Sequence, residues 1–298
     1  MILLTGTSGF IGAVLLDKLI DKYGADNILA LTSSPIEKCR YLLHNNYNVS
    51  PDSFLRSDFE NIDTIIHAGA FTPKQSTEAN EYFKCNSNII NTEALLKLGF
   101  PNLKRFIFLS TLDVYAVSDI INENSVVNPI SLYGHSKVYC EKMITSWANQ
   151  QNVLHQILRI GHVYGPGEEK YLKAIPVMIM KILNNEPIQI IGSGKDIRSF
   201  IFIDDVVNAI VKSMDLTFFN GPINIVSENQ ISIENLARQL IKIANSKVDI
   251  DFVKTTNDNI RRDFIFDNSK MKKYLLSKEI NFIEGLRSEF NYMKKIKA

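Results

Sequence analysis

Short apolar runs and amphipathic segments alternate through the first half of the chain. The runs are rich in Ile, Leu and Phe and are too short for helices, so they predict buried β-strands. They lie at residues 2–4, 28–31, 64–70, 105–111 and 154–160. Between them, apolar residues recur at helical spacing at residues 13–20, at 78–98 and in the segment that follows residue 132. This alternation predicts an α/β fold with a parallel sheet and right-handed crossovers.

The pattern changes past residue 166. We expect a helix at 173–183, a strand near 187–191, a helix from Val206, a strand at 223–226 and a serine-capped helix at 232–243. The sequence therefore predicts a dinucleotide-binding domain at 1–165 and a smaller C-terminal α/β substrate lobe at 166–298, with some strands and helices interleaved.

Three glycines, Gly6, Gly9 and Gly12, stand between the first predicted strand and the first predicted helix. Glycines here let the backbone turn tightly and approach a phosphate, and the helix N-terminus offers free N–H groups to a pyrophosphate. A plain tight turn is the alternative. We favour a Rossmann-type doubly wound sheet. Its predicted cofactor contacts are Gly6, Ser8, Gly9, Phe10, Ile11 and Gly12 in the loop, and the small residues Ala68, Gly69 and Ala70 after another strand.

The second predicted strand ends in hydroxyl side chains, where an NAD-binding fold has an acidic residue. Thr32, Ser33 and Ser34 occupy this place, and Lys38 and Arg40 follow closely. Hydroxyls and cations suit the 2'-phosphate of NADP, so NADP(H) is favoured as the cofactor and NAD(H) is the alternative. Lys38 and Arg40 could equally be solvated surface residues.

Tyr133 and Lys137 are four residues apart on a predicted helix, so their side chains leave the same face one turn apart. At an assumed separation of about 5 Å and an effective dielectric of about 20, the ammonium attracts an ionised phenol by about 3 kcal/mol. We therefore expect Lys137 to lower the pKa of Tyr133 toward neutrality, so that the phenol exchanges a proton with a sugar hydroxyl or ketone. The alternative is a chance pair on an ordinary amphipathic helix.

Composition narrows the classes of function. The 33 Lys and Arg against 32 Asp and Glu leave a formal net charge of +1, so no bulk field recruits nucleic acid or an anionic membrane. Three widely spaced cysteines argue against a disulfide framework, and no Cys or His pair has structural-zinc spacing, so we expect no metal. The first residues contain neither a basic leader nor a long apolar segment, so we expect a cytoplasmic protein without a membrane span.

Five ordered segments together resemble the extended short-chain dehydrogenase/reductase family of nucleotide-sugar epimerases, dehydratases and ketoreductases. They are the glycine loop, Ser110 to Tyr115, Tyr133-x-x-x-Lys137, Arg159 to Pro166, and Gly192 to Asp205. The resemblance covers nearly the whole chain. It implies a nucleotide-diphosphate sugar as substrate and a homodimer built on the helices at 78–98 and around Lys137.

By this resemblance Tyr133 is the catalytic acid or base, Lys137 binds the nicotinamide ribose and lowers the pKa of Tyr133, and Thr111 hydrogen-bonds the reacting oxygen. Asn88 resembles the family's helix asparagine in the cofactor site, and Arg198 resembles a cation that contacts the substrate diphosphate. The other expected substrate contacts are Phe71, Thr72, Asp113, Tyr115 and His162.

Some positions depart from the family pattern. His162 stands where the family often has asparagine, and Ser199 where it often has aspartate. Leu112 and Asp113 replace the Asp-Glu pair of the 4,6-dehydratases, whose carboxyls carry out an elimination. This replacement argues against a dehydratase.

The leading prediction is hydride transfer at C4 of a nucleotide-activated hexose. A 4-keto-sugar reductase that consumes NADPH is favoured, because no acidic residue follows the second strand. The alternative is an NAD-dependent 4-epimerase, which oxidises and re-reduces one carbon and retains its cofactor. A non-catalytic dinucleotide-binding scaffold is a second alternative, but it would ordinarily lose the hydroxyl, the tyrosine or the lysine that this chain keeps.

Overall fold

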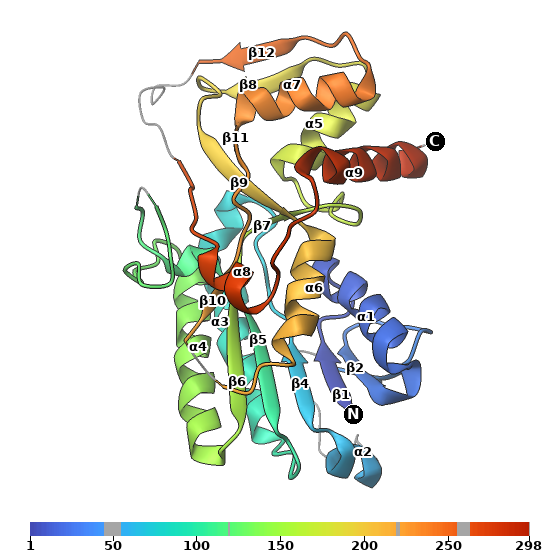
Figure 1. Ribbon diagram of the computed structural model, residues 1–298, viewed down its shortest axis with the longest axis vertical. Coiled ribbons are helices and arrows are strands. Elements are labelled where there is room, and N and C mark those ends of the chain that lie inside the picture. Colours follow the sequence, from blue (N-terminus) through green and yellow to red (C-terminus); the bar gives the residue numbers. More distant parts are fainter. Residues whose placement is uncertain (45–54, 119, 219–220, 255–262, 298) are drawn as a thin grey trace.

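The computed structural model describes residues 1–44, 55–118, 120–218, 221–254 and 263–297 (Figure 1). A layered α/β lobe lies below a smaller lobe in this view, and the C-terminal helix α9 (Phe282–Lys297) lies at their junction. Within these residues, no helix is long and apolar enough to cross a membrane.

Within the described residues, seven strands pair in parallel in the order β10-β6-β5-β4-β1-β2-β3. They are β1 (Ile2–Thr5), β2 (Ile28–Thr32), β3 (Arg40–Leu43), β4 (Thr64–His67), β5 (Arg105–Thr111), β6 (Leu154–Ile160) and β10 (Ile223–Ile225). The strand order reverses between β1 and β4, and ligands of open α/β sheets bind at the carboxyl ends of strands at such a reversal. The predicted α/β fold with a parallel, doubly wound sheet is confirmed.

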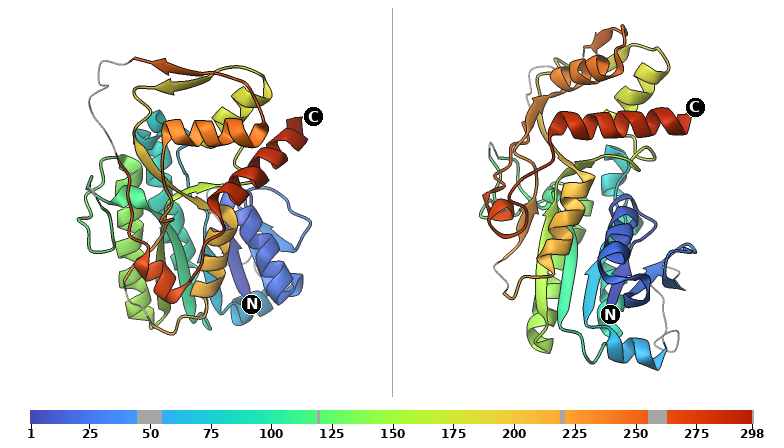
Figure 2. Two further views of the ribbon diagram at one scale, coloured as in Figure 1. Left: turned by 45° about the horizontal axis from the view of Figure 1, so that its top comes forward. Right: turned by 45° about the vertical axis from the view of Figure 1, so that its right-hand side comes forward.

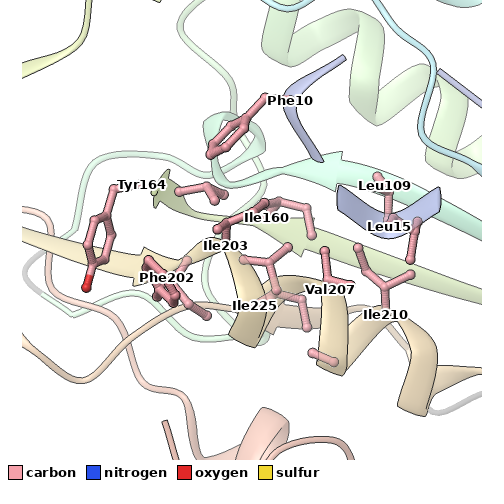
Figure 3. Packing of buried hydrophobic residues seen from close by; sticks show 14 of the residues in the cluster. Phe10, Leu15, Leu109, Ile160, Tyr164, Phe202, Ile203, Val207, Ile210 and Ile225 are labelled. Atoms are coloured by element: carbon pink, nitrogen blue, oxygen red, sulfur yellow. The ribbon is translucent and has the colours of Figure 1, made fainter. Parts of the chain in front are cut away.

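Helices cover both faces of this sheet (Figure 2). On one face, α1 (Phe10–Tyr23) and α6 (Ile203–Ser213) pack on strand residues such as Leu109 and Ile160 (Figure 3). On the other, α3 (Tyr82–Lys97) and α4 (Leu132–Gln151) bury Leu95 and Ile144 against Phe106 and its neighbours. Successive strand side chains alternate between these two clusters, as the period of a strand requires, and each buried Leu or Ile stabilises the fold by about 1.5–3 kcal/mol.

The smaller lobe contains two short sheets and helices that continue the same core. Its strands are β7 (His162–Tyr164), β9 (Ile197–Phe202) and β11 (Gln230–Ser232) in one sheet and β8 (Ile188–Ile191) and β12 (Ile250–Val253) in the other. Its helices are α5 (Ala174–Leu183), α7 (Ile233–Ala244) and α9. Their buried side chains belong to the same hydrophobic cluster as those of α1 and α6, so the two lobes share one core.

Several predicted boundaries differ from those in the structure. The helix predicted at 78–98 is a short 3-10 turn at Ser76–Asn80 followed by α3, and α6 begins at Ile203, three residues before Val206. The predicted strand at 223–226 is β10, which joins the large sheet beside β6, so the chain returns to the first lobe after entering the second. The predicted cap of α7 is confirmed, because Ser232 Oγ accepts the Asn235 N–H at 3.1 Å. The division of the chain at residue 165 stays a prediction.

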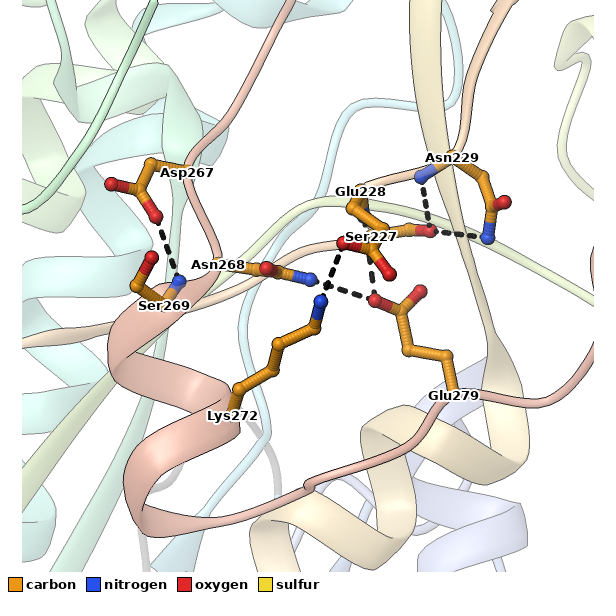
Figure 4. Close-up of polar contacts among 8 residues, drawn as sticks. All are labelled: Ser227, Glu228, Asn229, Asp267, Asn268, Ser269, Lys272 and Glu279. Atoms are coloured by element: carbon orange, nitrogen blue, oxygen red, sulfur yellow. Dashed lines mark hydrogen bonds and ion pairs between the residues drawn. The ribbon is translucent and has the colours of Figure 1, made fainter.

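The return from α8 (Ser269–Tyr274) to α9 is held by a polar network (Figure 4). Glu279 accepts hydrogen bonds from Asn268 Nδ2 at 2.7 Å and from the Glu228 N–H at 3.3 Å. Lys272 Nζ donates to Glu228 Oε2 at 2.5 Å. These contacts fix the segment that leads into α9 against the loop after β10. A short helix, α2 (Arg56–Asn61), precedes β4.

Candidate active site

The glycine loop lies at the carboxyl ends of β1 and β4. Gly6 has a φ of +78°, and a Cβ there would lie 2.5 Å from the Gly69 nitrogen. A Cβ on Gly12 would overlap the carbonyl oxygen of Gly6. Only glycine therefore lets α1 begin this close to the end of β1. The loop opens on a cavity of about 520 Å³, and its exposed backbone at a helix N-terminus fits a dinucleotide pyrophosphate.

A buried hydrogen-bond chain holds the two strand ends together. Thr5 Oγ1 accepts the Gly69 N–H at 2.9 Å and is hydrogen-bonded to His67 Nδ1 at 2.8 Å. His67 Nε2 then donates to Thr92 Oγ1 at 3.1 Å, and that hydroxyl donates to the Asn88 carbonyl at 2.7 Å. Burial is the main cause that lowers the pKa of His67 to about 3, with the positive charge of Lys137 adding to it. His67 is therefore a neutral residue that links β1, β4 and α3.

The cavity brings together three sets of predicted residues. The glycine loop contributes Gly6, Ser8, Gly9, Phe10, Ile11 and Gly12. The segment after β4 contributes Ala68, Gly69, Ala70, Phe71 and Thr72. The end of β5 and the first turns of α4 contribute Thr111, Tyr133 and Lys137. Cofactor-loop and catalytic candidates therefore face one space.

The first turn of α4 is held close to the end of β5. Ser131 Oγ accepts the Gly134 N–H at 3.1 Å and caps the helix. A Cβ on Gly134 would overlap the carbonyl oxygen of Asp113, so glycine permits this contact. Tyr133, 6% exposed, thereby comes within hydrogen-bonding reach of the side chains of Thr111 and Thr72. A hydroxyl bound at Tyr133 can contact Thr111 as well.

The expectation that Lys137 brings the pKa of Tyr133 toward neutrality is wrong. Burial raises the pKa of Tyr133, and the charge of Asp113 raises it further. Lys137 donates to the Leu109 carbonyl at 2.6 Å and lies 4.2 Å from the centre of the Phe108 ring. Burial also lowers the pKa of Lys137 to about 8. Desolvation of the phenol therefore outweighs the helix-face attraction that the spacing indicated.

Asn88 lies behind the cavity wall. Its Oδ1 accepts the Phe71 N–H at 2.7 Å, and its Nδ2 donates to the Phe71 carbonyl at 3.2 Å and to Ser136 Oγ at 3.2 Å. The side chain thus fixes the segment after β4 against α4. It shapes the pocket from a buried position, 3% exposed, rather than lining it.

The cations expected at a 2'-phosphate lie elsewhere. Arg40 begins β3 opposite Leu29, near the amino ends of the strands, and forms an ion pair with the buried Asp58. Lys38 pairs with Asp17 at 2.5 Å on the surface. Because cofactors bind at the carboxyl ends, the assignment of Arg40 to the cofactor site is wrong.

Of the three hydroxyl residues after β2, Ser33 lines the cavity, with its Oγ 3.5 Å from Ser8 Oγ. Thr32 is buried and shapes the turn, because its hydroxyl donates to the Ser34 carbonyl at 3.0 Å. Thr32 and Ser34 are not among the residues that line the cavity. Ser33 is therefore the one of these three residues that lines the cavity.

Tyr115 does not wall the cavity. It is 5% exposed, donates to Asn224 Oδ1 at 2.8 Å and stacks under the Arg159 guanidinium at 4.8 Å. Arg159 in turn forms a buried two-pronged ion pair with Glu141 of α4, at 3.0 and 2.6 Å. Its side chain points into this network, and the expected contact of Tyr115 with the substrate stays a prediction.

Asp113, His162 and Arg198 lie outside the residues that line the 520 Å³ cavity. His162 and Arg198 meet at Phe264, with a ring separation of 5.8 Å for His162 and a guanidinium-to-ring distance of 4.8 Å for Arg198. His162 is exposed to solvent. Desolvation by its neighbours and the charges of Lys173 and Arg198 nevertheless act to lower its pKa, which favours the neutral imidazole.

Sequence reasoning missed Lys173 and Tyr171, which line the cavity from the loop that follows β7. Lys173 is the cap residue of α5, where a positive charge opposes the helix dipole. A lysine at this position destabilises the helix, and this was the one sign in the sequence that Lys173 has another role. In the part of the chain that the structure describes, no three His, Cys, Asp or Glu side chains gather to hold a metal ion.

Comparison with known proteins decides the family. A sequence profile of the NAD dependent epimerase/dehydratase family matches residues 2–225. The chain belongs to this family. Membership of this family accounts for a glycine loop and a Tyr-x-x-x-Lys helix that line the same cavity.

Within the family, the chain is 30% identical over 273 residues to a dTDP-D-glucose 4,6-dehydratase of Dictyostelium discoideum, covering 82% of this chain and 62% of that protein. It is 26% identical over 313 residues to a putative UDP-glucose 4-epimerase of Methanocaldococcus jannaschii, covering 99% of this chain and 98% of that protein. The chain spans about half the length, 46–47%, of trifunctional Arabidopsis thaliana relatives.

Solved structures of the family share the fold. The crystal structure of UDP-glucuronic acid 4-epimerase from Bacillus cereus, in complex with UDP-glucuronic acid and NAD, superposes with a TM-score of 0.86. The two proteins are 25% identical, and the match covers 99% of each chain.

Proposed function

We propose that this chain is an NAD-dependent nucleotide-sugar 4-epimerase. One observation carries the proposal: Thr111, Tyr133 and Lys137 line the same cavity as the glycine loop. Family membership and the likeness to the Bacillus cereus 4-epimerase support it.

In this proposal Tyr133 takes the proton of the C4 hydroxyl as a hydride leaves C4, and a ketone forms. The hydride then returns to C4 on the opposite face of the ring, and Tyr133 returns the proton to the C4 oxygen. Thr111 hydrogen-bonds the reacting oxygen throughout, and the buried Lys137 holds positive charge beside the site. When bound, the oxidised dinucleotide supplies the hydride acceptor and a further positive charge, which opposes the effect of burial on the pKa of Tyr133.

The proposal favours NAD over NADP, the reverse of the preference drawn from Lys38 and Arg40. Both of these cations are engaged in ion pairs away from the cavity. Ser33 stands where many NAD-binding folds have an acidic residue that binds the ribose 2'-hydroxyl. This difference still favours a second candidate, an NADPH-dependent 4-keto-sugar reductase.

A 4,6-dehydratase is a weaker candidate despite the Dictyostelium relative. Leu112 is 8% exposed and packs in a small apolar cluster with Val114 and Phe266. A hydrocarbon side chain there cannot protonate a leaving hydroxyl, so the elimination lacks one of its two carboxyls.

The test uses purified protein, UDP- and dTDP-linked glucose and galactose, and no added cofactor. Interconversion of the 4-epimers, with NAD released on denaturation, supports the proposal. Stoichiometric consumption of added NADPH with a nucleotide-linked 4-keto-6-deoxyhexose would establish the reductase instead. Formation of a 4-keto-6-deoxy sugar from the glucose compound would establish the dehydratase.

Two matched tyrosines on α4 provide the control. Tyr133→Phe removes the proton acceptor and is expected to lower kcat by about 10²- to 10⁴-fold. Tyr139→Phe changes a side chain that is 56% exposed on the same helix and is expected to leave kcat unchanged. Equal rates in both variants would contradict the role of Tyr133.

We also propose that the chain forms a homodimer through α3 and α4. Exposed apolar side chains lie on α3, which packs against α4: Phe83 is 85%, Tyr82 63% and Ile90 54% exposed. Surface of this kind is rare on a monomer. Phe83→Glu is expected to convert a dimer to a monomer in sedimentation velocity, and an unchanged sedimentation coefficient would contradict this interface.

A further inference from the structure

Two carboxyl groups are buried together between α9 and the loop after β7. Glu168 of the loop and Glu289 of α9 are each 1% exposed and lie within hydrogen-bonding reach of one another. Among the described residues, no donor reaches Glu168 Oε2 or either carboxyl oxygen of Glu289 with hydrogen-bond geometry. Two buried carboxylates without such donors cannot both remain ionised, so burial raises the pKa of each and the pair keeps a shared proton.

Lys173 lies between this pair and the cavity. Its Nζ is 3.7 Å from Glu168 Oε2 and 3.5 Å from the Val163 carbonyl oxygen. Both distances exceed the value of about 2.7–2.9 Å that is typical of a charge-assisted hydrogen bond. The side chain is 40% exposed and lines the cavity, so the ammonium keeps N–H donors for a ligand.

The loop that carries Lys173 is fixed against the cofactor loop. Lys170 Nζ donates to the Ser8 carbonyl at 3.1 Å, and the Tyr171 ring lies 6.3 Å from the Phe10 ring. The charge of Lys173 also acts to lower the pKa of both Asp113 and His162. Lys173 therefore offers a positive charge to a ligand on the Asp113 side of the cavity.

Resting on the proposed function, we propose that Lys173 binds an anionic oxygen of the nucleotide sugar, and that Glu168 and Glu289 are the positioning residues that hold its ammonium at the cavity wall. The oxygen belongs to the diphosphate or to a carboxylate carried by the sugar. With one shared proton, the acid pair anchors Lys173 without cancelling its attraction for an anion.

The same arrangement makes substrate binding depend on pH. As the pH rises the shared proton leaves, and a second negative charge behind Lys173 weakens its hold on an anion. The other groups that face the pair are Lys173, Glu169 and Tyr171 of the loop and Tyr164 of β7. Tyr164 stays protonated because burial raises its pKa, and it donates to the Phe282 carbonyl at 3.2 Å, while Asp205 and Glu279 also act on it.

The test compares Lys173→Met and Lys173→Arg with Lys181→Met, a lysine of α5 that pairs with Glu186 outside the cavity. Calorimetric titrations with UDP, dTDP, GDP and NAD measure binding without turnover, and KM and kcat are measured with UDP-glucose and UDP-glucuronate. Lys173→Met is expected to raise the Kd of whichever of UDP, dTDP and GDP binds, or the KM for the UDP-sugar, by about 10- to 100-fold. The kcat and the Kd for NAD are expected to stay unchanged. Lys173→Arg is expected to recover most of the loss.

The outcomes separate the two proposals. Equal weakening of both sugar nucleotides assigns Lys173 to the diphosphate, and weakening of UDP-glucuronate alone assigns it to a carboxylate. Unchanged affinities, a loss confined to NAD, or no binding of any nucleotide would overturn the inference. If no sugar turns over but Lys173→Met still weakens UDP, dTDP or GDP, the inference stands and the epimerase proposal fails.

Glu289→Gln tests the positioning role. The amide supplies a permanent donor to Glu168, so the rise of KM between about pH 7 and 9 is expected to flatten while kcat is kept. A KM profile of unchanged slope in Glu289→Gln would show that the pair only packs the interior.

Discussion

The buried ion pair of Glu141 and Arg159 joins α4, the helix that carries Tyr133 and Lys137, to the sheet. Glu141 is 6% and Arg159 5% exposed. One Glu141 oxygen accepts from Arg159 Nε at 3.0 Å and from the Ser110 hydroxyl at 2.5 Å, and the other accepts from Arg159 Nη2 at 2.6 Å. Because Ser110 precedes Thr111 and Glu141 lies one turn beyond Lys137, this pair fixes β5 against α4 at the reacting groups.

Glu141→Gln keeps the size of the side chain but leaves the Arg159 charge buried without its counter-charge. Removal of one partner of a buried ion pair costs about 3–5 kcal/mol, so we expect the free energy of unfolding to fall by this amount. The loss is measured by urea denaturation followed by circular dichroism and tryptophan fluorescence, whose transitions must coincide. The activity per folded molecule is expected to fall as well, since Thr111 and Tyr133 lose their common support.

The double variant Glu141→Leu with Arg159→Met provides the control. Replacement of both charges by apolar side chains of similar volume removes the uncompensated charge, so the double variant is expected to be more stable than Glu141→Gln. A double variant that is as unstable as the single one, or a single variant with the stability of the parent protein, would refute this account of the pair.

Three further predictions concern the cofactor loop, the acid pair and the edge of the sheet. Gly12→Ala places a Cβ on the Gly6 carbonyl oxygen and is expected to weaken NAD binding at least about tenfold. Gly24→Ala, at a φ of +82° where Ala is strained, is expected to lower stability but to leave the NAD affinity of the folded protein unchanged. Equal Kd values for the two variants in fluorescence titrations would contradict this. The raised pKa values of Glu168 and Glu289 contribute stability that is fully present below about pH 4 and is lost as the pH rises through the folded-state pKa values. Glu289→Gln is therefore expected to flatten the decline of the unfolding free energy with rising pH, measured by urea denaturation. An equally steep decline in the variant would argue against a buried titrating pair. Arg40→Met breaks the pair with Asp58 and is expected to lower stability while the ratio of Kd values for NAD and NADP stays the same; a shift of that ratio would return Arg40 to the cofactor site.

The features that the sequence predicted correctly depend on local geometry. The spacing of the three glycines depends only on one strand, one turn and one helix that follow each other in the chain. The structure places these elements at the strand-order reversal. The helix period likewise placed Tyr133 and Lys137 on one face and in one cavity. Such features follow from neighbours in the chain, so a pattern is enough to find them.

The features that were missed depend on contacts between distant segments. The pKa of Tyr133 rises because α3, β5 and Asp113 enclose it, and no spacing within α4 reports that enclosure. Arg40 was misplaced because the register of β3 against β2 decides which end of the sheet it occupies. Lys173 and its acid pair were missed because Glu289 reaches Glu168 from α9, which is far from the loop in sequence.

The central claim is hydride transfer at C4 through a cofactor that stays bound. Its most direct test is epimerisation of a nucleotide hexose that carries deuterium at C4, followed by mass spectrometry of both epimers. The account predicts that substrate and product each keep the deuterium, that turnover needs no added cofactor, and that Tyr133→Phe slows interconversion by about 10²- to 10⁴-fold. Loss of the deuterium to solvent, or an unchanged rate of interconversion in Tyr133→Phe, would contradict it.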